Sequence, residues 1–448
     1  MKRFFSVALA LLLFAAIAPA QSPDIAAKVD EYIAAQMQVN QFSGAVLIAR
    51  EGKVLVRKGY GMANREWEVP NTPLTKFRLG SITKQFTSAA ILLLEERGKL
   101  TTEDSICKYL EPCPAPWQPV TIHHLLTHTS GIPSYTGLPN YMRTSGHART
   151  KEEMVALFRD LPLEFAPGER FKYNNSGYFL LGIIIEKISG QDYAAFLRAN
   201  IFDPLEMKDS GYDVTATVLP RRAAGYTRRD NVILNSDYID MGQPYSAGSL
   251  YSTVDDLYKW DQALEARKLL SAKSYEKWWT PYKDNYAYGW AIGAGARQSQ
   301  SHGGGIPGFS TDIARFPEQK ATVVVLANLA SAGASRIGRD LAAILFGDPY
   351  EIPRERVVAK VDPKIYDAYV GNYQLRPGFV IAVTREGDKL MTQATNQPKF
   401  EVFPESETKF FLRVVDAQLT FVKDAATGKV THIILHQGGG NQRANRID

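Results

Sequence analysis

Hydrophobic positions in the first part of the chain follow two different periods. From Asp24 to Met37 they recur at the spacing of a helix with one buried face, which predicts an amphipathic helix. The runs 44–49 and 54–60 are short, apolar and joined by a polar turn, and they predict an antiparallel hairpin. The continuous apolar run from Ser88 to Leu94 predicts a buried helix.

Farther along the chain, helical spacing and strand-like stretches alternate with loops. Residues 211–245 are rich in Arg, Tyr and Asp without a clear period, and we expect a substrate-facing loop there. Hairpins at both ends of this part, with helices between them, predict an α+β domain in which an antiparallel sheet is flanked by helices and by an all-helical cluster. The patterns predict helices at 121–128, 151–159, 178–188, 252–264 and 334–345, and strands at 288–292, 310–316 and 322–328.

The composition changes after residue 346. Residues 347–362 are charged and contain proline, as in a linker. From Tyr366 onward, short alternating stretches separated by polar turns predict a small antiparallel β barrel or sandwich. The expected organisation is a signal peptide at 1–20, a large domain at 21–346, a linker at 347–362 and a β domain at 363–448.

The first twenty residues have the composition of a secretory signal peptide. Lys2 and Arg3 precede an apolar run, and Ala18-Pro19-Ala20 provides a small-x-small cleavage site. We expect export by a bacterium, to the periplasm or beyond, with no membrane span after cleavage, because no second apolar run is long enough. Cleavage lowers the net charge from +5 to about +3, which is near balance, so nothing indicates nucleic acid as a partner.

The two cysteines, Cys107 and Cys113, lie on either side of a short Pro-rich loop. In an exported protein we expect a local disulfide, since two cysteines alone make an incomplete metal site. His124 and His128 have the spacing of a zinc-protease pair, but the Glu that this pattern needs between them is missing. We therefore expect neither a metal nor a cofactor.

Candidate chemistry begins at Gly80-Ser81-Ile82-Thr83-Lys84, a glycine turn that leads into the buried helix. If the helix begins near Ser81, Lys84 lies one turn further on the same face, where the two side chains can meet. An amine takes the serine proton only when it is neutral, and the apolar run behind Lys84 supplies burial that lowers an amine pKa from about 10.4. The helix N-terminus also favours negative charge on the serine oxygen.

The Ser-x-x-Lys pattern is weak by itself. It recurs at Ser105 to Lys108 and at Ser274 to Lys277, in a loop and just before a Thr-Pro stop. Only Ser81 has a glycine before it and a long buried helix behind it. The alternative interpretation of this stretch is a capping serine followed by a lysine in the first helical turn.

Two further stretches place polar side chains beside apolar elements. Tyr173-Asn174-Asn175 lies between a Pro-Gly turn and an apolar helix, where a tyrosine can relay a proton and an asparagine can hold a carbonyl group. Plain packing is the alternative interpretation of this loop. His302-Gly303-Gly304-Gly305 precedes the strands at 310–328, and its glycines allow a ligand to approach the backbone closely.

Together, the stretches at Ser81, Tyr173 and His302 resemble the three motifs of the serine β-lactamase and penicillin-binding protein family, nearest to its class C, esterase and D-aminopeptidase branch. The segment His128-Thr129-Ser130-Gly131-Ile132-Pro133 is similar to that family as well. The resemblance covers roughly residues 24–345, and the remainder resembles small β domains of unknown function attached to such hydrolases.

The resemblance implies a division of roles among these residues. Ser81 is the expected nucleophile, Lys84 its base, and Tyr173 the group that relays the proton to the leaving group and helps to activate the deacylating water. The N–H groups of Ser81 and Gly305 are expected to form an oxyanion hole, in which one donor contributes about 3 kcal/mol. Substrate binding is expected of Asn175, His302, Gly303 and Gly304.

One departure from the family pattern narrows the expected activity. Most β-lactamases and cell-wall carboxypeptidases have Lys-Thr-Gly where this chain has His302-Gly303-Gly304, so a permanent ammonium is replaced by a group that is mostly neutral near pH 7. We therefore expect hydrolysis of a small ester, a D-amino-acid peptide or a β-lactam-like compound, without strong β-lactamase activity, by a monomer or homodimer. The alternatives are a D-Ala-D-Ala carboxypeptidase, a weak β-lactamase, and a non-catalytic sensor that binds penicillin or cell-wall fragments.

Overall fold

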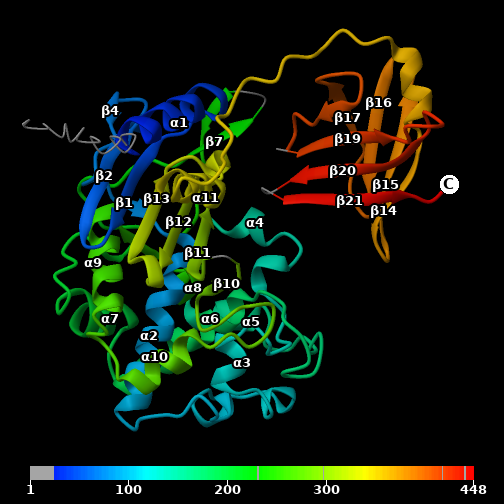
Figure 1. Ribbon diagram of the computed structural model, residues 1–448. Helices are drawn as coiled ribbons and strands as arrows, with labels where there is room; N and C mark the ends of the chain where they lie inside the picture. Colours follow the sequence, from blue (N-terminus) through cyan, green and yellow to red (C-terminus); the bar gives the residue numbers. More distant parts are fainter. Residues whose placement is uncertain (1–24, 230–231, 296, 416, 438–439) are drawn as a thin grey trace, which may run out of the picture.

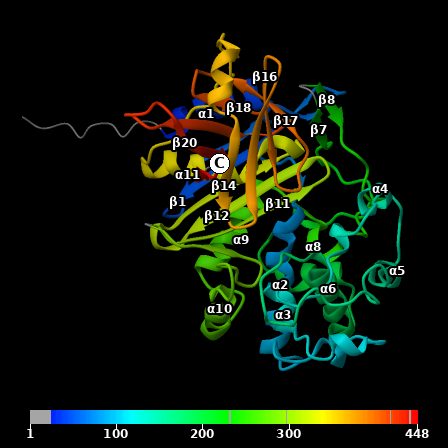
Figure 2. The same ribbon diagram turned by 90° about the vertical axis from the view of Figure 1, so that its right-hand side faces the viewer.

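The computed structural model describes residues 25–229, 232–295, 297–415, 417–437 and 440–448 (Figure 1). The signal peptide expected at 1–20 lies outside these residues. Within the described ranges, no helix is both long and apolar enough to cross a lipid bilayer. The chain forms a large α+β body and, at its C-terminal end, a β barrel (Figures 1 and 2).

The α-helices of the described residues all belong to the large body. They are α1 (Ile25–Asn40), α2 (Thr83–Glu96), α3 (Ile122–Leu126), α4 (Tyr141–Thr144), α5 (Lys151–Ala156), α6 (Asn175–Ser189), α7 (Tyr193–Leu197), α8 (Tyr245–Gly248), α9 (Val254–Glu265), α10 (Ala272–Trp279) and α11 (Ala334–Phe346). A 3₁₀ turn, η1 (Gly80–Ile82), leads into α2.

The strands of the large body form one main sheet and three small ones. The main sheet has six antiparallel strands in the order β10-β11-β12-β13-β1-β2, and the small sheets pair β3 with β4, β7 with β8, and β9 with β5 and β6. The bounds are β1 (Gly44–Arg50), β2 (Lys53–Tyr60), β3 (Met62–Asn64), β4 (Val69–Pro70), β5 (Phe77–Arg78), β6 (Gly211–Tyr212), β7 (Tyr226–Arg229), β8 (Val232–Asn235), β9 (Leu250–Ser252), β10 (Ala291–Gly293), β11 (Ser299–Ile306), β12 (Phe309–Phe316) and β13 (Ala321–Ala327).

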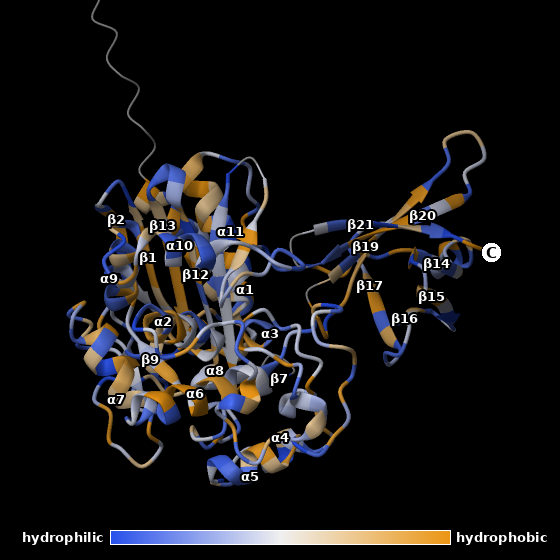
Figure 3. Cartoon of the chain, turned by 90° about the horizontal axis from the view of Figure 1, so that it is seen from below, coloured by the Kyte–Doolittle hydropathy of each residue, from blue (hydrophilic) through white to orange (hydrophobic). Residues whose placement is uncertain are grey.

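The main sheet separates two hydrophobic cores. Strand β1 pairs with β2 on one side and with β13 on the other, so the first hairpin of the body joins its last. Because successive side chains of a strand point to opposite faces, Val46 and Ile48 pack with α1 and α11, whereas Ala45 and Leu47 face the core that contains α2 and α9. The predicted α+β arrangement is confirmed, and Figure 3 shows the apolar central strands of this sheet.

Helix α2 is the axis of the helical cluster. Every residue from Thr83 to Leu94 is buried, which explains why this stretch reads as apolar on all sides. The indole of Trp260 stacks on Phe86 with ring centroids 4.4 Å apart, and Trp278 Nε1 donates to Ser88 Oγ over 3.0 Å. This packing makes α2 a rigid support for the turn η1 at its N-terminal end.

One predicted strand has different bounds in the structure, and one strand was not predicted. Strand β10 begins at Ala291, so the stretch 288–290 lies outside it. The segment His302-Gly303-Gly304 does not precede the sheet but lies within β11, with His302 opposite Ile313 and Gly304 opposite Thr311. Glycines weaken the alternation by which strands are recognised in a sequence, and here main-chain pairing with β12 forms the strand.

The loop expected at 211–245 and the helix expected at 121–128 also need correction. The first contains β6 and the hairpin β7–β8, whose side chains Val232 and Leu234 are exposed, so that burial produces no apolar period. The second, α3, ends at Leu126, and His128 adopts a left-handed backbone with φ 58°. His124 and His128 therefore do not lie on one helical face.

The C-terminal part is a closed antiparallel barrel of eight strands, which decides between the barrel and the sandwich. Strand β14 pairs with β21 to close it, with Tyr373 opposite Arg446. Its interior is filled by aliphatic and aromatic side chains, among which the rings of Tyr369 and Phe421 stack with centroids 4.3 Å apart. The bounds are β14 (Gly371–Arg376), β15 (Phe379–Glu386), β16 (Lys389–Ala394), β17 (Phe400–Pro404), β18 (Lys409–Phe411), β19 (Ala417–Lys423), β20 (Val430–Gln437) and β21 (Gly440–Arg446).

Candidate active site

Ser81 lies in the turn η1, two residues before the first residue of α2. Helix α2 itself begins at Thr83 and not at Ser81. Gly80 has φ 55°, in the left-handed region that favours glycine, and a Cβ atom there would lie 2.9 Å from Gly305 N of β11. The Thr311 hydroxyl donates to Leu79 O over 2.7 Å, so the sheet holds the turn that carries Ser81.

The Lys84 amine points at the Ser81 hydroxyl from inside the protein. Its Nζ atom lies 3.0 Å from Ser81 Oγ, 2.9 Å from Asn175 Oδ1 and 2.9 Å from Ala247 O. The Lys84 side chain is 0% exposed, and this burial lowers its pKa well below that of an ordinary lysine.

The three neighbours of Lys84 Nζ determine how a neutral amine would be oriented. The amide oxygen of Asn175 and the carbonyl oxygen of Ala247 can only accept hydrogen bonds. A neutral amine has two N–H groups for these two acceptors, and its lone pair is then directed at the third neighbour, Ser81 Oγ. The arrangement is that of a base hydrogen-bonded by its serine.

The other two Ser-x-x-Lys pairs lack this environment. Lys108 Nζ lies 3.1 Å from the Asp104 carboxylate, and Lys277 Nζ lies 2.8 Å from the Glu95 carboxylate. A neighbouring carboxylate favours the charged ammonium, which cannot accept a proton. The lysine at position 84 differs from both because its three hydrogen-bond partners are uncharged.

Tyr173 covers the Lys84 amine on the cleft side. The Nζ atom of Lys84 lies 4.8 Å from the centre of the Tyr173 ring, although the two residues are distant in sequence. Tyr173 exposes 37% of its surface. Burial around the hydroxyl group raises the pKa of Tyr173, while a hydrogen bond with the Ser81 side chain lowers it.

Asn175 lies at the start of α6 and is held through both ends of its amide group. Its Oδ1 atom accepts from Lys84, and its Nδ2 atom donates to Thr136 Oγ1 over 3.0 Å, which assigns the oxygen and nitrogen positions. The helix N-cap is Asn174, whose Oδ1 accepts from Gly177 N over 2.9 Å. The Tyr173-Asn174-Asn175 loop thus delivers a tyrosine, a cap and an amide in sequence.

His302 is buried beside these groups and uses both ring nitrogens within the protein. Its Nδ1 lies 2.6 Å from Gly303 O, a group that only accepts, so Nδ1 carries the hydrogen. The other nitrogen, Nε2, then accepts from the Tyr286 hydroxyl over 2.9 Å. Burial, and next the charge of Lys84, lower the pKa of His302 to about 4, so the ring is neutral at pH 7.

The glycines of β11 let the strand pass directly over the serine turn. A Cβ atom on Gly304 would lie 1.9 Å from Leu79 O, and one on Gly303 would lie 2.5 Å from Ser335 Oγ. Gly305 is exposed, and a Cβ atom there would meet nothing within 4 Å. The structure therefore brings the main chain of Gly305 next to Gly80 while Gly305 itself stays exposed.

Several residues of this site were not expected from the sequence. The Ala247 carbonyl, the Thr136 hydroxyl and the Tyr286 hydroxyl each hold one predicted residue. His128 packs under Tyr173 with ring centroids 4.3 Å apart and accepts from Asn174 N over 3.1 Å. The similarity of its segment to the family was the one sequence signal for any of them.

Other features named from the sequence lie outside this cluster. Cys107 and Cys113 are joined by a disulfide with Cα atoms 5.3 Å apart. His124 Nδ1 accepts from the main-chain N–H of Thr121 as part of a capping box. Among the described residues, no group of three or more His, Cys, Asp or Glu side chains is arranged to hold a metal ion.

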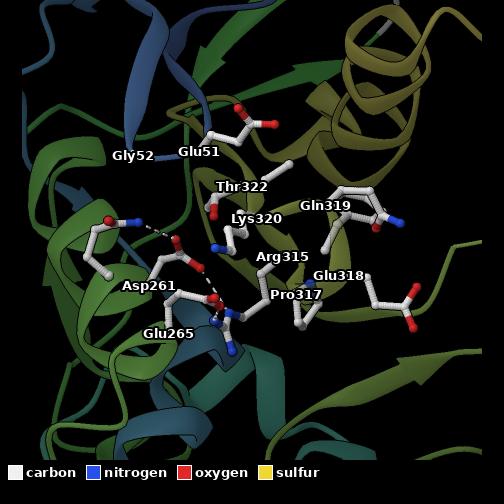
Figure 4. Close-up of a pocket in the computed structure, with 13 residues that line it drawn as sticks. Glu51, Gly52, Asp261, Glu265, Arg315, Pro317, Glu318, Gln319, Lys320 and Thr322 are labelled. Carbon is white, nitrogen blue, oxygen red and sulfur yellow. Dashed lines mark hydrogen bonds and ion pairs between the residues drawn. The ribbon is translucent and has the colours of Figure 1, made fainter.

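A pocket of about 530 Å³ lies apart from these residues, at the turn between β12 and β13 (Figure 4). Its most buried charged side chain, Arg315, is 2% exposed and donates to Asp261 over 2.9 Å and to Glu265 over 3.3 Å. None of the predicted site residues lines this pocket.

An antiparallel sheet with a helical cluster, and a serine facing a buried lysine one turn away, define a class of Ser-x-x-Lys proteins. Residues 29–347 match the family model described as Beta-lactamase, and residues 355–445 match one described as a domain of unknown function, DUF3471. The chain belongs to the β-lactamase and penicillin-binding protein family, and a DUF3471 domain follows the family domain.

Individual relatives agree with this assignment. Penicillin-binding protein 4* of Bacillus subtilis is 34% identical over 439 residues, which cover 91% of this chain and 95% of that protein. The octameric penicillin-binding protein homologue of Pyrococcus abyssi has a TM-score of 0.66 and 28% identity over 94% of this chain and 99% of its own. A penicillin-binding protein from Bacillus halodurans has a TM-score of 0.62 and 31% identity, over 70% and 99% of the two chains. The monomer or homodimer expected for this protein stays a prediction.

Proposed function

We propose that the protein is an exported serine hydrolase that forms an acyl-enzyme on Ser81 and cleaves an ester or amide, such as a small ester or a D-amino-acid peptide. The observation that carries the proposal is the contact between Lys84 Nζ and Ser81 Oγ, because Asn175 and Ala247 can occupy the two N–H groups of a neutral amine and leave its lone pair to the Ser81 hydroxyl. Family membership supports a hydrolase of this general type.

In the proposed acylation step, Lys84 accepts the Ser81 proton while Ser81 Oγ attacks the substrate carbonyl carbon. Burial supports this assignment, because it keeps the Lys84 amine neutral without any change of partner. The new C–O bond converts the carbonyl oxygen to an oxyanion. The main-chain N–H groups of Ser81 and Gly305 would receive that charge, and the close approach of Gly80 to Gly305 supports this role.

The leaving group departs when the tetrahedral intermediate collapses, and it needs a proton to do so. Tyr173 is assigned as the donor because burial raises its pKa and keeps the phenol protonated. A proton then passes from the lysine, now an ammonium, to the phenolate of Tyr173, whose ring lies over Lys84 Nζ with its centre 4.8 Å away. The lowered pKa of Lys84 thus suits the base, and the raised pKa of Tyr173 suits the acid.

Deacylation repeats these transfers with water as the nucleophile. Lys84 and Tyr173 together accept a proton from water as it attacks the acyl carbon, and the proton returns to Ser81 Oγ as the ester bond breaks. Asn175 is assigned to orient the substrate, a role that requires its Nδ2 group to leave Thr136 and turn to the substrate carbonyl.

Substrate choice is assigned mainly from His302, which stands where most β-lactamases have a lysine. A neutral ring whose nitrogens both bind the protein offers no charge to a substrate carboxylate. This favours esters and amides that have no carboxylate over penicillin-type β-lactams and carboxy-terminal peptides, which carry one. The second candidate, a sensor that binds penicillin or cell-wall fragments without turnover, draws its support from the penicillin-binding relatives.

The proposal is tested by intact-mass analysis after exposure to a fluorophosphonate and, separately, to a penicillin, with Ser81→Ala as the control. We expect a fluorophosphonate adduct on the wild type that is absent from the variant, and turnover of a p-nitrophenyl ester. A stable penicillin adduct without ester turnover would favour the sensor. No adduct with either reagent on folded protein would refute the acyl-enzyme.

A further inference from the structure

A pocket of about 540 Å³ opens from the candidate active site along the other face of β11. Its mouth is lined by Tyr173, Tyr286 and His302. From there it continues over Gly303 and between β12 and α11. A Cβ atom on Gly303 would lie 2.5 Å from Ser335 Oγ, so glycine at this position lets the Ser335 side chain of α11 lie directly against β11.

The inner wall of this pocket contains a buried carboxylate, Asp312 of β12. The side chain lies opposite Gly303 in the sheet and is only 5% exposed. Its Oδ1 atom accepts from Ser335 Oγ over 2.7 Å. The Oδ2 atom lies beside Gly338 of α11, where a Cβ atom would approach it to 2.6 Å. Glycine at 338 therefore makes the room that this carboxylate occupies.

The other charges of the pocket lie nearer to solvent. Arg297 and Asp348 form an ion pair with each other and so cancel locally. Arg339 is exposed, and its charge lowers the pKa of Asp312 only in part, because burial, the larger effect, raises that pKa to about 6. Solvent screens an exposed charge much more than a buried one. The inner wall therefore presents a buried carboxylate, and the positive charge of Arg339 offsets its burial only in part.

The pocket lies within reach of a bound substrate. Gly305 is two residues along β11 from Gly303, and Asp312 is on the neighbouring strand, so the Cα atoms of Gly305 and Asp312 are about 8 Å apart. A flexible arm of a few carbon atoms, extending from a carbonyl group at Gly305, covers that distance around the edge of the strand.

We infer that this pocket binds a primary ammonium group carried on such an arm of the substrate, through the Asp312 carboxylate. The inference rests on the proposed hydrolase function and names part of its substrate. Apolar side chains of β12 and α11, such as Ala314 and Ala342, line the passage and suit the methylene groups of the arm. A carbon chain with a terminal amine is thus complementary to the pocket along its whole length.

The experiment compares two esters of the same length, p-nitrophenyl hexanoate and the same ester with a terminal amino group. For the wild type we expect kcat/KM to be about tenfold or more higher for the amino ester, as for a hydrogen bond to a charged group. In Asp312→Asn, which keeps the shape and the Ser335 contact, this ratio should fall to about one, mainly through KM. The double variant Arg297→Gln/Asp348→Asn, which removes both members of the ion pair at the same pocket, should keep the wild-type ratio.

Three results would overturn the inference: a wild-type ratio near one, a preference that persists in Asp312→Asn, or a higher kcat/KM for the ester with a terminal carboxylate, which would assign the pocket to Arg339. If neither ester is hydrolysed, the proposed function fails, and a binding measurement then tests the ammonium site by itself. Calorimetry with hexylamine and hexanol on Ser81→Ala should then show amine binding that is lost in Ser81→Ala/Asp312→Asn. Equal binding of both compounds would refute the ammonium site independently of catalysis.

Discussion

The Lys84 amine lies 3.0 Å from the Ser81 hydroxyl oxygen, and its two other hydrogen-bond partners are the uncharged oxygens of Asn175 and Ala247. A charged lysine in a site that is fully buried would need a carboxylate to offset its desolvation. The two comparable lysines, Lys108 and Lys277, each have one. Burial combined with neutral partners is therefore what distinguishes the lysine that faces Ser81, and it motivates the first two predictions.

Lys84→Met should reduce the rate of fluorophosphonate labelling by roughly 10²–10⁴-fold, the usual contribution of general-base catalysis. The methionine side chain has a similar length but no amine, so Ser81 keeps its position and loses its base. The labelling rate is measured by quenching the reaction after several intervals and determining the labelled fraction by intact-mass analysis.

Lys277→Met is the matched control, because Ser274 and Lys277 have the same spacing and Lys277 binds Glu95 instead. It should label at the wild-type rate. Wild-type labelling of Lys84→Met would show that another group deprotonates Ser81.

The pH profile of kcat/KM should have an acid limb set by Lys84. Because burial lowers the pKa of Lys84, the amine is protonated only below that depressed value, and the rate falls as the pH drops through it. The pKa of Tyr173 is raised, so its deprotonation should not reduce the rate until strongly alkaline pH. Initial rates with an uncharged ester, measured across the pH range in which the protein stays folded, give the position of this acid limb. An acid limb at the pKa of an ordinary lysine would contradict the assignment of Lys84 as a neutral base.

Gly304→Ala should lower the acylation rate by about 10²-fold, the effect expected when reacting groups are displaced by about 1 Å. The added Cβ atom would lie 1.9 Å from Leu79 O, so β11 must move away from the serine turn and take Gly305 with it. Gly295→Ala, in the turn between β10 and β11, meets nothing within 4 Å and should label normally. Equal labelling of both variants, with both proteins folded, would exclude this dependence on the position of β11.

His302 should make the protein sensitive to acid. The pKa of the ring is about 4 in the folded protein and 6.5 as the ordinary value, so the unfolded chain binds the proton first as the pH falls. The contribution of His302 to the free energy of unfolding is present above pH 6.5 and is lost progressively down to pH 4. Complete loss amounts to about 3 kcal/mol, since one pKa unit corresponds to about 1.4 kcal/mol.

Urea unfolding of the wild type and of His302→Gln at neutral and acidic pH measures this contribution. Glutamine takes up no proton, so the wild type should lose about 3 kcal/mol more than the variant between the two conditions. His147→Gln, at an exposed loop position, should behave as the wild type. Identical acid sensitivity in the wild type and in His302→Gln would contradict the depressed pKa of His302.

Local sequence patterns predicted most of the elements that position the site. The apolar run behind Lys84 predicted the buried helix, and the runs 44–49 and 54–60 predicted the hairpin β1–β2. These predictions succeed because burial on one or both sides imposes a period that neighbouring residues share. Strand β11 was missed as a strand because its three glycines have no side chains to show a period.

The sequence by itself brought Ser81 and Lys84 within reach of each other, since side chains three residues apart in a helical turn are neighbours. That Lys84 contacts Ser81, whereas Lys277 at the same spacing binds Glu95, depends on the surroundings. The sequence also determined the positions of Tyr173, Asn175 and His302, through their similarity to a family. Only the tertiary structure decided the chemistry of these groups. The Ala247 carbonyl that occupies a Lys84 N–H group carries no side-chain signal, and the tautomer of His302 depends on Tyr286 and on its own strand. Protonation depends on desolvation and on partners far apart in the chain, and folding alone brings these together.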